Sequence, residues 1–251
     1  MYSQKIIKRF KNPKFAGEMK NSEEVWAIVP TRGGSTGLFE KNIRIIAGKP
    51  LLHYMLSAAK GARLLNRVIL TTDNDNIAQT ANQISGVEVR RHNPSLSTSG
   101  QPSFGVFRQT LEKLIQEGGV VPKAVVFLRV TTPLCLFSDI DNAIALLFEN
   151  ENAATSVLSV TKSDVHPKRV YMIGKSGILR AREETPERDY PLPRQRFDDV
   201  YIRNGAIYTT FPGVVLGGSL WGNKPLAYIM PKERSININD EVDFILAETL
   251  L

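Results

Sequence analysis

The chain has 251 residues, of which 42% are hydrophobic, so it is long enough to bury one sizeable α/β core. Its formal net charge of +7 favours anionic ligands, but no RNA-binding aromatic motif accompanies the basic residues, so we expect small anions and no nucleic acid as partners. A single cysteine, Cys135, excludes an intramolecular disulfide and is typical of a cytoplasmic protein, and no apolar run approaches the ~20 residues of a membrane span.

The sequence divides into a polar N-terminal extension, residues 1–24, and one domain, residues 25–251. The extension is basic but lacks the apolar stretch of a secretory signal, so we expect it to lie outside the core.

The domain opens with a short apolar run, Val25 to Val29, that predicts a buried strand broken by Pro30. The next loop is rich in glycine and carries Arg32 and Lys41. Glycines let a backbone turn tightly and expose several N–H groups to one ligand, and the two cations suit a polyphosphate. The loop has neither the Walker spacing nor the dinucleotide spacing, and the alternative is an ordinary glycine-rich surface loop.

Strands and helices then alternate along the chain, which predicts a parallel sheet with right-handed crossovers. Ligands of such sheets bind at the carboxyl ends of the strands. The predicted helices are residues 50–65, 76–84, 104–116, 139–149 with Ser138 as N-cap, and 241–250 with Val242, Ile245, Leu246 and Leu250 on one face. The further predicted strands are residues 67–72, 87–90, 124–128, 155–160, 200–210 and 227–230.

Residues 162–199 interrupt this pattern. Charge rises, prolines recur and apolar runs shorten, which indicates an excursion from the sheet and not a second domain with its own core. Long excursions of this kind are usually functional or interfacial.

Seven separated motifs occur together in one order along the domain. They begin at Ile28 (Ile-Val-Pro-Thr-Arg-Gly-Gly-Ser-Thr-Gly), Lys41 (Lys-Asn), Gly48 (Gly-Lys-Pro-Leu), Thr71 (Thr-Thr-Asp), Thr131 (Thr-Thr-Pro-Leu), Arg203 (Arg-Asn-Gly-Ala-Ile-Tyr) and Tyr228 (Tyr-Ile-Met-Pro-Lys-Glu-Arg-Ser-Ile). This set resembles the acylneuraminate cytidylyltransferases, the CMP-sialic acid synthetases and their relatives for legionaminic and pseudaminic acids. The resemblance runs from about residue 25 to the end of the sequence.

The resemblance implies a three-layer α/β/α fold of the nucleotide-diphospho-sugar-transferase type, with a mostly parallel sheet. It also implies a homodimer formed through the 162–199 excursion. The implied reaction transfers CMP from CTP to an acidic nine-carbon (nonulosonic) sugar, releases pyrophosphate and uses Mg²⁺. Phosphoryl transfer of this kind depends on positioning and charge neutralisation more than on covalent help.

The resemblance also assigns site residues. Arg32 and Lys41 are the expected catalytic residues. The expected nucleotide-binding residues are Gly33, Gly34, Ser35, Asn42, Arg91 and Ser103. The expected sugar-binding residues are Arg129, Thr131, Asn204, Gly205 and Tyr208. For Asn204 and Gly205 the alternative is a tight turn, and for Tyr208 it is a core aromatic.

The chain departs from the family pattern at several of these positions. Thr36 stands where a lysine is usual, Arg129 where a neutral glutamine is usual, and Cys135 where an arginine is usual. The two aspartates that carry magnesium in the family are here Asn237 and Asn239. Asparagine offers only a neutral carbonyl oxygen, so we expect the metal position to consist of these two residues and the adjacent Asp240. Asp73 is a second possible carboxylate, for which the alternative is a cap at the end of its strand.

Three readings follow. The first is a cytidylyltransferase that acts on a nonulosonic acid. The second is a related nucleotidyltransferase with altered sugar or nucleotide specificity, suggested by Arg129, because a guanidinium can pair with an additional anionic group. The third is a non-catalytic homologue that binds a nucleotide or sugar, suggested by Asn237 and Asn239.

Overall fold

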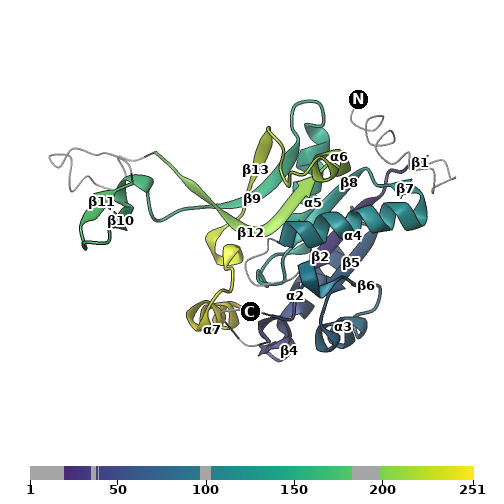
Figure 1. Cartoon of the computed structure of the whole chain (residues 1–251), viewed down its shortest axis with the longest axis horizontal. Helices are drawn as coiled ribbons and strands as arrows, with labels where there is room; N and C mark the ends of the chain where they lie inside the picture. The colour runs from purple at the N-terminus through teal and green to yellow at the C-terminus, as the bar shows by residue number, and fades with distance from the viewer. Residues whose placement is uncertain (1–19, 35–37, 39, 97–102, 183–197) are drawn as a thin grey trace.

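A computed structural model describes residues 20–34, 38, 40–96, 103–182 and 198–251. Its centre is a seven-stranded sheet in the order β13-β9-β12-β8-β2-β5-β6 (Figure 1). The strands are β2 (Val25–Pro30), β5 (Arg67–Thr72), β6 (Glu88–Arg91), β8 (Ala124–Leu128), β9 (Ser156–Lys162), β12 (Tyr201–Thr210) and β13 (Pro225–Ile229). All neighbours pair in parallel except β12, which is antiparallel to both β8 and β9. The predicted mostly parallel sheet is therefore confirmed.

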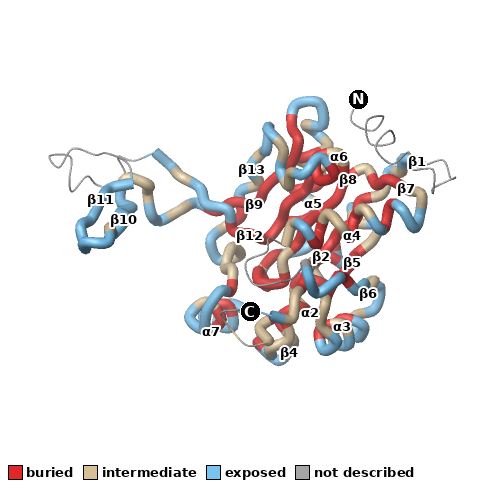
Figure 2. Tube along the Cα trace, viewed as in Figure 1, coloured by how far each residue is buried: buried red, intermediate tan, exposed pale blue. Residues whose placement is uncertain are grey.

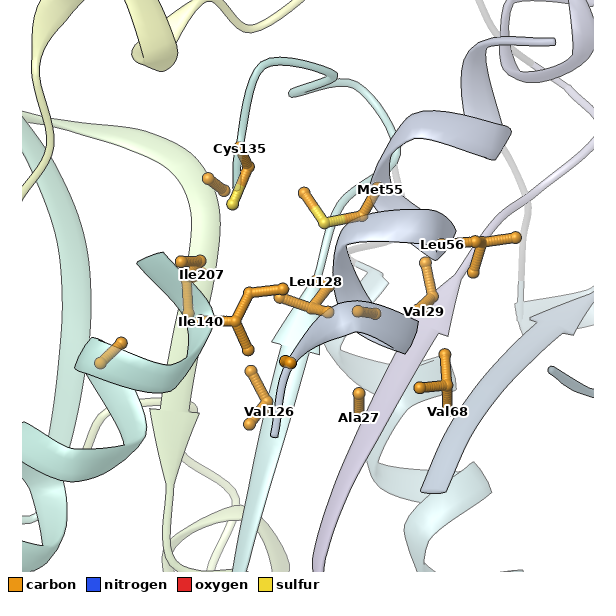
Figure 3. Close-up of a cluster of buried hydrophobic side chains, with 14 of the residues drawn as sticks. Ala27, Val29, Met55, Leu56, Val68, Val126, Leu128, Cys135, Ile140 and Ile207 are labelled. Carbon is orange, nitrogen blue, oxygen red and sulfur yellow. The ribbon is translucent and has the colours of Figure 1, made fainter. Parts of the chain in front are cut away.

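Helices cover both faces of this sheet, which gives the three layers that were expected. One cluster joins Ala27 and Val29 of β2 to α2 (Leu51–Gly61), α3 (Asp75–Asn82) and α5 (Phe137–Glu149) (Figure 3). A second cluster joins Trp26 and Ile28 of the same strand to α4 (Ser103–Gly118) and α6 (Pro212–Leu216). Successive side chains of a strand point to opposite faces, so a short run that is apolar throughout serves both clusters.

The last helix, α7 (Glu241–Leu250), packs beside the sheet on a third, smaller cluster. Its buried residues are Phe244 and Ala247, three apart, which contact Ile46, Leu51 and Ile238. The four residues that the sequence grouped on one face are instead exposed, Val242 at 73%. Only a narrow side of α7 meets the body, so most of its apolar surface stays outside the core.

The start of α5 also differs from expectation. The helix begins at Phe137, so Ser138 lies inside its first turn and is not the N-cap. Asp139 performs the capping function, because its Oδ2 accepts a hydrogen bond from the N–H of Leu136 (3.0 Å). An aspartate in the first turn also interacts favourably with the helix dipole.

The excursion leaves the body on the extended ends of β9 and β12 and carries the short hairpin β10 (Tyr171–Ile173) and β11 (Leu179–Ala181), preceded by the turn η3 (Pro167–Arg169). Figure 1 shows this hairpin projecting well away from the sheet, and Figure 2 shows that it is exposed throughout. Residues 183–197 of the predicted excursion lie outside the described residues.

Small elements complete the chain. They are β1 (Lys20–Asn21), which pairs with β7 (Val120–Val121), the hairpin β3 (Ile45–Ile46) and β4 (Lys49–Pro50), and the short helices η1 (Lys41–Ile43), η2 (Pro94–Leu96) and η6 (Lys232–Ser235). The β1 pairing attaches the end of the predicted N-terminal extension to the body, while its first nineteen residues lie outside the described part. Within the described residues no helix combines the length and hydropathy that crossing a bilayer requires.

Candidate functional site

The direction of the strands brings the candidate residues together. Arg32 follows the carboxyl end of β2, and Arg129 follows the carboxyl end of β8. Because β12 runs in the opposite direction, its first half, with Gly205, reaches the same edge of the sheet. Ile207 pairs with Leu128 across the β12–β8 ladder, which sets Gly205 close to Arg129. The predicted location at the carboxyl edge thus combines residues from strands far apart in sequence.

A cleft of about 280 Å³ lies at this edge. Seven of the residues predicted for the site line it, namely Arg32, Lys41, Asn42, Ser103, Arg129, Thr131 and Asn239. Four further residues that the sequence did not single out complete the lining, namely Pro30, Thr31, Phe127 and Val130.

Three cations converge on the cleft. Burial lowers the pKa of Lys41, and the guanidinium of Arg129 lowers it further. The carboxylate of Asp243 raises this pKa, Arg32 lowers it, and the carboxylate of Asp240 raises it. The ammonium of Lys41 donates a hydrogen bond to the carbonyl of Ile238 (2.7 Å). Among the described residues, neither Arg32 nor Arg129 forms an ion pair with a carboxylate. The cleft therefore presents positive charge that an anionic ligand can neutralise.

Two hydrogen bonds shape the glycine-rich loop. The N–H of Gly33 donates to Oδ1 of Asp73 (2.8 Å), and Nδ2 of Asn42 donates to the carbonyl of Arg32 (2.9 Å). A Cβ on Gly33 would lie 2.7–3.0 Å from the side chain of Asn74, so only glycine permits this approach to the β5 edge. Gly34 is exposed, and Ser35 lies outside the described residues.

Asn204 lies behind the cleft and not in its lining. Its Oδ1 accepts hydrogen bonds from Ser159 Oγ (2.6 Å) and the N–H of Ala206 (3.1 Å). Its Nδ2 donates to Ser235 Oγ (2.9 Å) and contacts the sulfur of Met230 (3.2 Å). Both the oxygen and the nitrogen of the amide therefore have partners in the protein. The side chain connects β9, β12 and η6 and supports the cleft from behind.

Two other predicted residues also point elsewhere. Tyr208 is buried against Phe127, with ring centroids 5.7 Å apart, in the core arrangement that the sequence left as its alternative. Arg91 is at the carboxyl end of β6 but pairs with Asp75 (3.0 Å) and donates to the carbonyl of Asp73 (2.9 Å). Neither of these side chains lines the cleft.

The segment after η6 crosses the end of β8, where the N–H of Ile238 donates to the carbonyl of Thr131 (2.8 Å). Asn239 lines the cleft, and its Nδ2 donates to the carbonyl of Asn237 (2.9 Å). Oδ1 of Asn237 is buried without a partner among the described groups. The carboxylate of Asp240 is the N-cap of α7, where it accepts the N–H of Asp243 (3.0 Å).

This donor set does not fit a magnesium ion held by the protein. Mg²⁺ prefers anionic oxygen ligands, whereas the two asparagines offer neutral amides and Oδ1 of Asp240 is used to cap α7. No group of three or more His, Cys, Asp or Glu side chains within the described ranges is arranged to hold a metal. The three cations around the cleft make the position still less favourable for a second cation.

The sequence analysis missed the residues that hold this segment in place. Asp139 is only 1% exposed and accepts hydrogen bonds from Arg234 Nε (3.1 Å), Arg234 Nη2 (3.0 Å) and Tyr228 Oη (2.9 Å). The interaction fixes η6, which leads directly into Asn237. A buried aspartate has no local signature when its partners lie about ninety residues away. Phe127 and Val130 could have been predicted, since they lie within two residues of Arg129 at the strand end.

Comparison with known proteins decides the family. A family model described as cytidylyltransferase matches residues 26–209. The chain belongs to the cytidylyltransferase family. Among curated relatives, N-acylneuraminate cytidylyltransferase of Escherichia coli O18:K1:H7 is 28% identical over 228 residues, covering 90% of this chain and 52% of its own length. N-acylneuraminate cytidylyltransferase A of Danio rerio is 26% identical over 229 residues, covering 91% of this chain and 51% of its own length.

The resemblance found from the motifs is therefore confirmed at the level of the family. The chain spans about half the length of the curated relatives it matches. Among solved structures, CMP:2-keto-3-deoxy-manno-octonic acid synthetase complexed with CTP aligns at a TM-score of 0.67 and 13% identity, over 90% of this chain and 98% of that one. A 4-diphosphocytidyl-2C-methyl-D-erythritol synthase from Anaerococcus prevotii aligns at a TM-score of 0.60 and 14% identity, over 95% of this chain and 98% of that one. These likenesses establish the cytidylyltransferase type of fold.

Proposed function

We propose that the cleft binds CTP and transfers its CMP group to a nonulosonic acid. An oxygen of the sugar attacks the α-phosphorus, the bond from that phosphorus to the bridging oxygen of the β-phosphate breaks, and pyrophosphate leaves. The proton of the sugar hydroxyl passes to solvent. The single observation that carries the proposal is the convergence of Arg32, Lys41 and Arg129 on one cleft in a chain of this family.

Each residue has a role that its position supports. Arg32 and Lys41 hold the triphosphate. Ser103, the first residue of α4, presents a hydroxyl and the helix N-terminus to the nucleotide. Thr131 lines the same cleft, where its hydroxyl, unpartnered among the described residues, is available to the bound substrates. Preorganised positive charge stabilises the charge that develops on the leaving pyrophosphate.

The assembly and location are proposed on separate grounds. A homodimer through the projecting hairpin is supported by the exposed apolar residues on both of its strands, among them Met172, Ile173 and Leu179. A cytoplasmic location agrees with one free cysteine. Mg²⁺ stays an expectation of the resemblance, and because the donor set does not fit it we assign no step to it.

Two alternatives are each favoured by one observation. Arg129, without an acidic partner among the described residues, is compatible with an acceptor that carries an additional anionic group. The neutral pair Asn237 and Asn239 is compatible with a chain that binds nucleotide but does not turn it over.

The test is pyrophosphate release by purified protein given CTP and a panel of nonulosonic acids, with and without Mg²⁺. We expect release with at least one sugar, and a fall of about a hundredfold or more in Arg32→Ala, because one charge-assisted contact to the transferring group is lost. Folded protein that binds CTP but releases nothing across the panel supports the non-catalytic alternative. Stabilisation by a purine nucleotide, but not by CTP, supports altered specificity.

A further inference from the structure

A cluster of like charges lies in the cleft. Arg32, Lys41 and Arg129 all line this one cleft of about 280 Å³, so the three cations are close enough to repel one another. The carboxylates of Asp243 and Asp240 offset part of this repulsion at Lys41, and an anionic ligand in the cleft would offset more of it. A ligand with several adjacent negative charges fits this cluster.

The groups next to Arg129 are neutral. A Cβ on Gly205 would lie 3.3 Å from Nη1 of Arg129 and 3.2 Å from Nδ2 of Asn237, so these two side chains cover the same glycine. An aspartate at position 237 would form an ion pair with this guanidinium, whereas the amide leaves it free for a ligand. Oδ1 of Asn237 has no partner among the described groups.

Thr131 provides an independent indication of a ligand. Its side chain is 9% exposed and lines the cleft, and its Oγ1 has no hydrogen-bond partner among the described residues. A buried hydroxyl without a partner is unfavourable unless a ligand or water completes it. The unsatisfied hydroxyl and the free guanidinium therefore face the same space.

We propose that Arg129, together with Lys41 and Arg32, neutralises the triphosphate directly, so that this cleft binds CTP without a divalent metal ion. The inference rests on the proposed function, since it concerns the same nucleotide. It assigns to fixed cations the charge neutralisation that a magnesium ion would otherwise supply, and it accounts for a donor set that does not fit the ion. Because free CTP carries more negative charge than its magnesium complex, adding Mg²⁺ should not tighten binding.

Isothermal titration with CTP, in EDTA and in Mg²⁺, tests this. We expect the wild-type dissociation constant in EDTA to be within about threefold of that in Mg²⁺. Arg129→Gln should weaken binding in EDTA by about 10–100-fold, the usual loss for a hydrogen bond to a charged group, and Arg129→Lys should recover part of it. Arg63→Gln is the matched control, because it removes the same charge from an exposed site before β5, at the opposite edge of the sheet, and should leave binding unchanged.

A second variant tests the role of the neutral neighbour. Asn237→Asp should form an ion pair with Arg129 and weaken binding in EDTA by about tenfold. The inference is overturned if CTP binds only in Mg²⁺, if Arg129→Gln binds like wild type, or if Asn237→Asp tightens binding in the presence of Mg²⁺. Each of these results leaves CTP binding, and thus the proposed function, intact. Failure to bind CTP under both conditions contradicts the proposed function itself.

Discussion

Gly205 lies next to Arg129, one of the residues that line the cleft. Its φ is +81°, in the region that favours glycine, and the side chains of Arg129 and Asn237 cover the space where a Cβ would stand. Gly177, in the turn of the projecting hairpin, has a nearly identical φ of +79° but nothing within 4 Å of the corresponding position. Replacing either glycine with alanine therefore has a similar backbone strain, and the two positions differ in the atoms that surround them.

Gly205→Ala should damage the site more than the fold. Both Gly205→Ala and Gly177→Ala should lose roughly 1 kcal/mol of unfolding free energy from the positive φ. Only Gly205→Ala should also weaken CTP binding, on the order of tenfold, because the methyl group displaces Arg129 and Asn237. Urea denaturation and CTP titration measure the two effects. Equal CTP affinity in the two variants would show that nothing binds against Gly205.

Asp139 acts as the anchor of η6. Asp139→Asn should cost about 2–4 kcal/mol of unfolding free energy, because the amide cannot accept from Arg234 and Tyr228 and the N–H of Leu136 at once. The matched control is Glu112→Gln, which breaks the pair of Glu112 with Arg108 on the surface of α4 and should cost no more than about 0.5 kcal/mol. Chemical denaturation compares them, and similar losses in the two variants would refute an anchoring role.

Among the elements, the projecting hairpin exposes apolar side chains on both of its strands. Ile173 and Leu179 pair across its two strands and are both exposed. Replacing both with serine should weaken the proposed homodimer at least about tenfold, since each buried aliphatic side chain contributes about 1.5–3 kcal/mol. Light scattering over a concentration series measures the change.

The control for this experiment comes from α7, which also exposes apolar side chains. Val242→Ser with Ile245→Ser changes two exposed residues of that helix and should leave the mass unchanged. If the α7 pair dissociates the dimer and the hairpin pair does not, the contact lies on α7 and the proposed role of the hairpin is wrong.

Most elements could be predicted from local pattern. The strand at Val25 and the helix covering Leu51 to Gly61 follow from apolar runs and from helical spacing. The direction of β12 could not be predicted in this way, because antiparallel pairing with β8 and β9 is decided by contacts far apart in sequence. The buried side of α7 could not be predicted from the pattern either, because apolar residues occur all around that helix. Tertiary contacts decide that Phe244 and Ala247 are the buried residues.

In the candidate site too, local pattern predicts some residues and tertiary contacts decide others. Arg32 and Arg129 could be predicted to meet, because each follows a strand at one edge of a parallel sheet, and Lys41 belongs to the connection after the first of these strands. Asn204 and Tyr208 lie on β12, where the side that each faces depends on the irregular register between Arg203 and Tyr208. Their hydrogen-bonding and ring partners are distant in sequence. The sequence alone therefore could not show whether these two side chains support the cleft or contact a ligand.

At the scale of the whole molecule, two histidines make stability depend on pH. Burial lowers the pKa of His92, which the charge of Asp73 partly opposes, and burial also lowers the pKa of His53. As pH falls below about 6.5 the unfolded chain takes up protons that the folded chain resists, so stability is lost on acidification. The slope is at most about 1.4 kcal/mol per pH unit for each proton.

His92→Asn tests this contribution, because it retains a polar group near Thr71, with which His92 makes a 3.0 Å hydrogen bond. The variant should lose some stability at pH 8 but show a shallower decline between pH 6.5 and 5 than wild type. Urea denaturation at several pH values measures both curves. Parallel curves across that interval would contradict a buried neutral His92.

A crystal structure of the chain soaked with CTP in the absence of divalent metal would show whether the cleft after β2 and β8 holds the triphosphate. We expect phosphate oxygens within hydrogen-bond distance of Arg32, Lys41 and Arg129. Nucleotide bound elsewhere on the molecule, or a cleft left without nucleotide while its three cations pair with other protein groups, would contradict it.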